Sequence, residues 1–126
     1  MNNLLGIDFG ERFIGLAIKK ESVSIPYAHK IIDTNLSDIV VELKETVENE
    51  DITKIVVGYP KGLMNKDTRM SKLVDNFIDN KLKNNFKISI VKIDERLTSK
   101  IIKSNTDKRH DDLSAVKILE TFCSNE

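Results

Sequence analysis

The chain has 126 residues, of which 40% are hydrophobic and 32% are charged, a balance typical of a soluble globular protein. This length predicts that residues 1–126 fold as a single domain, without any need for disulfides or a structural metal. Twenty Lys and Arg balance twenty Asp and Glu, so the net charge gives no general attraction to nucleic acid or to a membrane.

The chain begins with three segments that have the length and composition of β-strands. Residues 4–8 are short and mostly apolar, which predicts a buried strand. Gly10 and Glu11 are predicted to form a turn, after which residues 13–18 return as the second strand of a hairpin. A third strand is expected over residues 25–32. Strands joined by such short connections can form an antiparallel meander.

Helical and strand patterns alternate in the rest of the chain. Residues 54–58 and 88–93 are predicted strands, a short helix is possible after Glu95, and a last helix is expected to begin near Asp111. Asn35 or Ser37 is a candidate cap for the first helix. The apolar residues that recur at helical spacing are Leu36, Ile39, Val40, Leu43 and Val47 in the first helix, and Met70, Leu73, Val74, Phe77, Ile78 and Leu82 in the second.

This order of elements predicts an α/β fold with one mixed sheet. Strands that are connected through helices tend to run parallel, whereas the first three strands can run antiparallel. We therefore expect a mixed five-stranded sheet with helices packed on it, and with a strongly apolar strand at its centre.

The first candidate for chemistry is Asp8, at the end of the first predicted strand and two residues before Gly10. A carboxylate at such a position is costly unless it is paired or binds a metal. Gly10 lets backbone or a ligand approach closely at the turn. The alternative is an aspartate that only caps a tight turn.

A second acidic group follows the last predicted strand, where Asp94, Glu95 and Arg96 are consecutive. Ligands gather beyond the carboxyl ends of parallel strands in open α/β sheets. Glu95 suits a metal ligand, and the planar guanidinium of Arg96 suits phosphate oxygens. A salt-bridge cluster at the surface is the competing interpretation.

A third acidic group, Asp111 and Asp112, begins the last predicted helix directly after three basic residues. Either aspartate taken singly is adequately explained as a cap or as a partner of the helix dipole. The three acidic groups together suggest more, because Mg²⁺ prefers oxygen ligands. Two such ions can activate a water and stabilise the leaving oxygen in phosphodiester cleavage, which needs only a few convergent carboxylates.

Charge is unevenly distributed along the chain. Residues 33–51 contain seven acidic residues and one lysine, whereas residues 81–110 contain nine Lys or Arg and three acidic residues. The second segment could attract a polyanion that the first repels. Two solvated faces without functional meaning remain the alternative.

Four blocks of the sequence, in this order, resemble the YqgF family of RuvC-like proteins in the ribonuclease H superfamily. The blocks are GIDFGERFIGLAI, IVVGYPKG, IDERLTS and DDLSAVKIL, and the resemblance covers almost the whole chain. It implies a ribonuclease H-like fold and a metal-dependent nuclease with Mg²⁺ or Mn²⁺ as cofactor. Members are described as Holliday junction resolvases and as nucleases that mature the 5′ end of pre-16S ribosomal RNA, and we expect the second role here.

The resemblance also implies which residues act. The metal-holding, catalytic carboxylates match Asp8, Glu95 and Asp111, the last because it precedes Ser114 by three positions. The residues expected to contact nucleic acid are Arg96, Thr98, Lys100, Lys103, Lys108 and Arg109. The stretch between Thr98 and Asp111 is shorter than is usual in the family, which puts the range of substrates in question.

Several rivals share parts of this pattern. A resolvase acting on branched DNA would use the same chemistry but would need a dimer with two sites facing one junction. A non-catalytic nucleic-acid-binding factor of the same fold is disfavoured because all three acids are present. One half of an actin-like ATPase also begins with D-x-G, but such proteins need two such domains.

The remaining expectations concern compartment and partners. Cys123 is the single cysteine, so neither an intrachain disulfide nor a multi-cysteine zinc site is possible. No signal-peptide segment precedes Asp8, and no apolar run approaches the roughly 20 residues of a membrane helix. We therefore expect a cytoplasmic protein without membrane contact, a monomer or weak homodimer whose partner is precursor ribosomal RNA or branched DNA.

Overall fold

The computed structural model describes residues 2–59, 69–94 and 110–124, with only the backbone of residues 110–112. Five strands form one sheet in the order β3-β2-β1-β4-β5. The strands are β1 (Leu4–Asp8), β2 (Phe13–Lys19), β3 (Tyr27–Asp33), β4 (Lys54–Tyr59) and β5 (Ser89–Asp94). β1, β2 and β3 pair antiparallel, whereas β1, β4 and β5 are parallel neighbours, which confirms the predicted mixed sheet.

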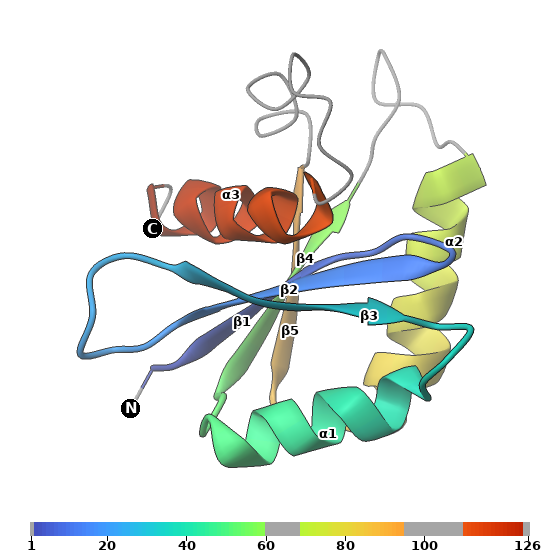
Figure 1. The fold of residues 1–126 in the computed structure, drawn as a ribbon, viewed down its shortest axis with the longest axis horizontal. Coiled ribbons are helices and arrows are strands. Elements are labelled where there is room, and N and C mark those ends of the chain that lie inside the picture. The colour runs from blue at the N-terminus through green and yellow to red at the C-terminus, as the bar shows by residue number, and fades with distance from the viewer. Residues whose placement is uncertain (1, 60–68, 95–109, 125–126) are drawn as a thin grey trace.

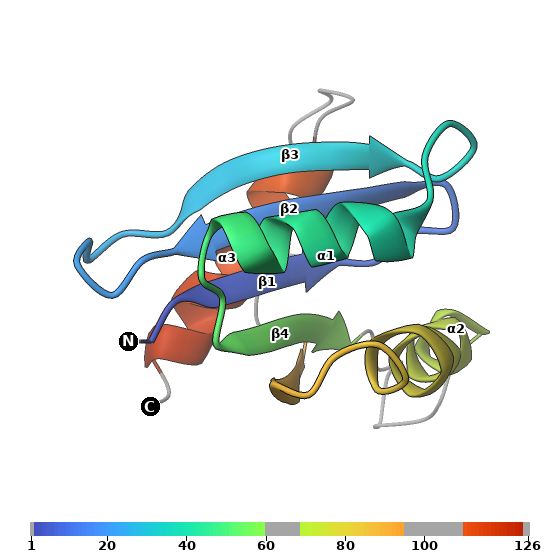
Figure 2. The ribbon, with the colours of Figure 1, turned by 90° about the horizontal axis from the view of Figure 1, so that it is seen from below.

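Helices cover both faces of the sheet. α1 (Ile39–Asn49) and α2 (Arg69–Phe77), which continues as one π-helical segment η2 (Ile78–Leu82), lie on one face. α3 (His110–Ser124) lies on the other face and crosses β1 and β2 (Figures 1 and 2). No helix in the described ranges is both long enough and apolar enough to span a bilayer.

The alternation of side chains along the strands supplies a core on each face. Leu5 and Ile7 of β1 belong to the core beneath α1 and α2, together with buried Leu43 and Val74. Leu4, on the opposite face of β1, belongs to the smaller core under α3. Since the side-chain period of a strand is two, Gly6 and Asp8 lie on the α3 face with Leu4.

Two expected boundaries were wrong. The third strand begins at Tyr27, not at residue 25, because Pro26 has no backbone N–H for the ladder and the Ile25 side chain is 65% exposed. Neither Asn35 nor Ser37 caps α1. Its cap is Asp38, whose side chain accepts hydrogen bonds from the backbone N–H groups of Val40 and Val41.

A turn that follows β3 explains the second error. The carbonyl oxygen of Asp33 accepts hydrogen bonds from the N–H groups of Leu36 and Ser37, at 2.9 and 3.0 Å. The backbone N–H groups of Leu36 and Ser37 are therefore bonded within this turn, before the helix begins. The Leu36 side chain is 82% exposed and does not belong to the apolar face of α1. The remaining predicted strand and helix boundaries among the described residues agree with the structure to within about one residue.

α3 approaches β1 closely because Gly6 has no side chain. A Cβ atom on Gly6 would lie 2.7 Å from Cγ of Leu119 and 3.0 Å from the carbonyl oxygen of Ala115. Neither atom is the end of a flexible side chain, so the helix could accommodate a methyl group only by moving away from the sheet.

We predict that Gly6→Ala lowers the free energy of unfolding by about 1–3 kcal/mol through overpacking. Chemical denaturation followed by circular dichroism measures this loss. Leu119→Ala removes the nearest contact, so Gly6→Ala should cost less in that background than in the wild type. Equal costs in the two backgrounds would show that the contact with Leu119 is not the cause.

Candidate active site

Asp8 is the last residue of β1, at the edge of the sheet where the three parallel strands end. The alternation along β1 places its side chain on the α3 face, and the residue is half-buried. The two ends of the strand thus differ, since Leu4 packs in the core whereas Asp8 presents a carboxylate near the surface.

Glycines stand beside Asp8 on both neighbouring strands. Gly15 of β2 is its registered partner, and Gly58 of β4 follows Val57, the partner of Ile7. Neither neighbour adds a side chain next to the carboxylate on the α3 face. Both glycines are buried, so the absence of their side chains lets another part of the chain or a ligand approach the sheet closely beside Asp8.

The end of β5 lies at the same edge. Gly58 of β4 is paired with Ile93, and Tyr59 with Asp94, so β5 ends one residue beyond the level of Asp8. The preceding alternate residue, Lys92, donates a hydrogen bond to Asp75 of α2 at 3.1 Å. Asp94 is therefore on the α2 face, opposite to Asp8.

The N-terminal part of α3 lies toward the carboxyl end of β1. Cys123, near the end of the helix, lies near Leu4 at the start of the strand, and Ala115 lies against Gly6. Because α3 crosses β1 and β2 obliquely, the helix leads from Gly6 toward the edge at which Asp8 lies.

Most of the predicted site lies outside the described residues. This applies to Glu95, Arg96, Thr98, Lys100, Lys103, Lys108 and Arg109. The side chains of Asp111 and Asp112 are not described either. Among the side chains that are described, no group of three or more His, Cys, Asp or Glu could hold a metal ion. The predicted carboxylate triad is therefore not tested by the structure.

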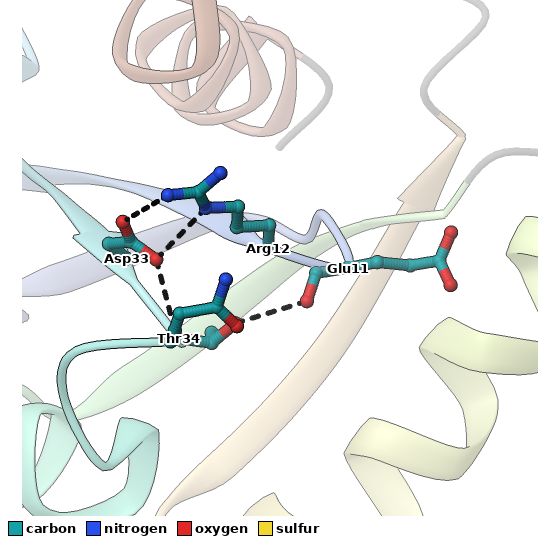
Figure 3. Close-up of polar contacts among 5 residues, drawn as sticks. Glu11, Arg12, Asp33 and Thr34 are labelled. Atoms are coloured by element: carbon teal, nitrogen blue, oxygen red, sulfur yellow. Dashed lines mark hydrogen bonds and ion pairs between the residues drawn. The ribbon is translucent and has the colours of Figure 1, made fainter.

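The turn between β1 and β2 is held by contacts that the sequence analysis missed. The guanidinium of Arg12 donates to both carboxylate oxygens of Asp33, at 3.3 and 3.2 Å (Figure 3). Thr34 donates from its backbone N–H to the carbonyl oxygen of Arg12 at 2.7 Å, and from its hydroxyl to that of Glu11 at 3.1 Å.

A second ion pair holds the same turn from another side. Arg69, the first residue of α2, donates to both carboxylate oxygens of Glu11, at 2.9 and 2.7 Å. The hydrogen bonds from Arg69 lower the pKa of Glu11, and those from Arg12 lower the pKa of Asp33. Both acids consequently stay ionised to lower pH than they would without their arginine partners.

Sequence patterns could hardly have revealed these contacts. Arg12 and Asp33 are 21 positions apart, and Glu11 and Arg69 are 58 apart. Only the hairpin register, which pairs Phe13 with Asp33, brings the first pair together. Charged residues at strand ends are common enough that neither pair was distinguishable from ordinary surface charge.

The family model described as "RuvX: Holliday junction resolvase" matches residues 2–125. The chain belongs to the RuvX family. The match spans nearly the full chain, and it confirms the resemblance to RuvC-like proteins that the four sequence blocks indicated.

Relatives of this RuvX chain are named for a different function. A protein of Mesoplasma florum, named "Putative pre-16S rRNA nuclease", is 31% identical over 140 residues, covering 97% of this chain and 96% of the relative. A protein of Sulfurihydrogenibium with the same name is 30% identical, covering 97% of this chain and 90% of the relative.

Solved structures confirm the fold of this RuvX chain. T. thermophilus RuvC, in complex with a Holliday junction substrate, superimposes with a TM-score of 0.61 at 10% identity, covering 99% of this chain and 96% of that one. The fowlpox virus Holliday junction resolvase gives a TM-score of 0.51 at 10% identity, covering 98% and 99%. These likenesses establish the ribonuclease H-like α/β fold that was predicted.

Proposed function

We propose that this RuvX protein is a metal-dependent nuclease that hydrolyses phosphodiester bonds in the 5′ region of pre-16S ribosomal RNA. The observation that carries the proposal is the position of Asp8, on the α3 face at the edge where the parallel strands end. Family membership and the names of the curated relatives support the reaction and the substrate class.

The proposed metal ligands are Asp8, Glu95 and Asp111. Glu95 follows directly after β5. Within β5, Ile93 packs in the core under α3, so Asp94 lies on the opposite face of the sheet from Asp8. For Asp111, the support is that it lies in the first turn of α3, on the N-terminal side of Ala115, which packs against Gly6 of β1.

The donor set fits Mg²⁺ or Mn²⁺, because three carboxylates offer only hard oxygen ligands. When bound, a pair of such ions activates a water and stabilises the leaving oxygen. The three carboxylates would supply the negative charge that holds the ions, and β1 orients Asp8. Gly15 and Gly58 add no side chain beside Asp8, so neither would hinder the approach of a scissile phosphate to that carboxylate.

Substrate binding is assigned to the basic segment that connects β5 to α3. The proposed contacts to phosphate and sugar are Arg96, Thr98, Lys100, Lys103, Lys108 and Arg109. The planar guanidinium of an arginine can donate two hydrogen bonds to phosphate oxygens, whereas the ammonium of a lysine acts as a point charge. Such contacts favour any polynucleotide, so selection among substrates must come from their shape and from unpaired bases.

A second candidate is a resolvase that cuts branched DNA. The description of the family as a Holliday junction resolvase and the RuvC structure with its junction favour this alternative. It requires two copies of the chain with both sites facing one junction, whereas an RNA nuclease acts as a monomer or weak homodimer. In either case we place the protein in the cytoplasm, where its substrate is found.

We predict that the purified protein cleaves a pre-16S leader RNA in Mg²⁺ and leaves a four-way DNA junction intact. Product lengths on denaturing gels measure both reactions. EDTA should abolish RNA cleavage, and added Mg²⁺ should restore it. Cleavage that persists in EDTA would refute the metal mechanism, and preferential cleavage of the junction would establish the resolvase alternative.

Asp8→Asn is expected to remove most of the activity while the fold is retained. The substitution preserves shape but removes the charge that a bridging ligand needs, and by analogy with other catalytic groups the loss should be about 10²-fold or more. Thermal denaturation provides the control for folding. A variant that melts like the wild type and also cleaves like it would exclude Asp8 from the site.

A further prediction separates two adjacent acids on α3. Asp111→Asn should abolish cleavage with little loss of stability, because it removes a proposed ligand. Asp112→Asn should cleave almost normally and lose about 0.3–1 kcal/mol, because an acid in the first turn interacts with the helix dipole. Cleavage rates and urea denaturation of both variants test this. The opposite pattern would move the ligand by one residue.

A further inference from the structure

The turn that follows Asp8 is tight. A Cβ atom at Gly10 would lie 2.3 Å from the carbonyl oxygen of Phe13, so the chain folds back on itself directly there. Residues 9–12 have no regular secondary structure of their own. The turn begins directly after Asp8, whose carboxylate is the proposed metal ligand.

Two bidentate ion pairs hold this turn at successive residues. Glu11 is bound by Arg69 of α2, and Arg12 is bound to Asp33 at the end of β3. Thr34 adds the hydrogen bond from its hydroxyl to the carbonyl oxygen of Glu11 (Figure 3). Its backbone N–H donates to the carbonyl oxygen of Arg12. The turn is thus tied to two different elements, and a bidentate pair fixes orientation as well as distance.

Global stability does not account for these pairs. The side chains are largely exposed, at 58% for Arg12 and 72% for Arg69, and exposed pairs are weak stabilisers because water screens them. Asp33 is less exposed, at 18%, because it also accepts the N–H of Asn35. The two ion pairs are therefore better explained by the conformation that they give to the turn than by a contribution to the free energy of unfolding.

We propose that Arg12 and Asp33, assisted by Glu11 and Arg69, are positioning residues that hold the β1–β2 turn and thereby fix the carboxylate of Asp8 for metal binding. The proposal rests on the proposed nuclease function. A displacement of about 1 Å at a catalytic group can lower a rate by roughly a hundredfold, so a weak surface contact can matter for the rate.

The competing role for Arg12 is direct contact with a substrate phosphate. The two roles make opposite predictions for Asp33. If Arg12 positions the turn, removing either partner has the same effect. If Arg12 binds phosphate, Asp33 is a competitor, and its removal should free the guanidinium and strengthen binding.

The test compares Arg12→Gln, Asp33→Asn and the double variant with the wild type. Positioning predicts that both single variants lose about ten-fold in kcat and need several-fold more Mn²⁺ for half-maximal binding. The KM for leader RNA should stay within about two-fold of the wild type. The double variant should be no worse than either single variant, because the two residues act as one unit.

Mn²⁺ binding is measured by electron paramagnetic resonance in the absence of RNA, so it does not depend on cleavage. Lys30→Gln is the matched control, because it removes an ion pair of the same kind, Lys30–Glu42 at 2.6 Å, that does not touch the turn. We expect this control to match the wild type in Mn²⁺ binding and in kcat.

Each other outcome overturns a specific claim. A raised KM in Arg12→Gln with a lowered KM in Asp33→Asn would assign Arg12 to phosphate and refute positioning. Wild-type values in all variants would refute it too. A wild-type protein that neither binds Mn²⁺ nor cleaves RNA would instead refute the proposed function itself.

Discussion

The parallel pairing of β1 with β4, and of β4 with β5, is the constraint on which the rest of this structure depends. It brings the carboxyl ends of strands from distant parts of the sequence to one edge of the sheet, where loops can carry polar groups without disturbing the core. The register then places Asp8 level with Gly58 and one residue short of the end of β5. The closeness of α3, permitted by Gly6, adds the third element at that edge.

The architecture was largely predictable because its signals are local. The continuous apolar run from Ile55 to Val57 follows from burial of β4 on both faces of the sheet. The helical spacing from Leu73 to Phe77 follows from burial of one face of α2. The cap of α1 was missed for an equally physical reason. Asp33 accepts hydrogen bonds from the backbone N–H groups of Asn35 and Leu36 in a turn. The helix therefore begins after this turn, and Asp38 is its cap.

The site was less predictable, because its parts meet only in three dimensions. Asp8 could be identified from its motif, but the glycines that flank it belong to other strands and depend on the register. Spacing alone could not decide between Asp94 and Glu95, whereas the contact of Lys92 with Asp75 shows which face Asp94 occupies. The ion pairs around Glu11 and Arg12 join residues that no local pattern connects, and they emerged only with the fold.

Convergence of Asp8, Glu95 and Asp111 on a shared metal site is tested most directly by crystals grown in Mn²⁺. Anomalous diffraction at the manganese absorption edge locates bound manganese without reference to any enzyme assay. We expect a peak at the carboxyl edge of the sheet, on the α3 face, within coordination distance of these three carboxylates, at about 2.0–2.2 Å. Manganese bound instead to Asp112, or on the α2 face near Asp94 and Asp75, would contradict this convergence.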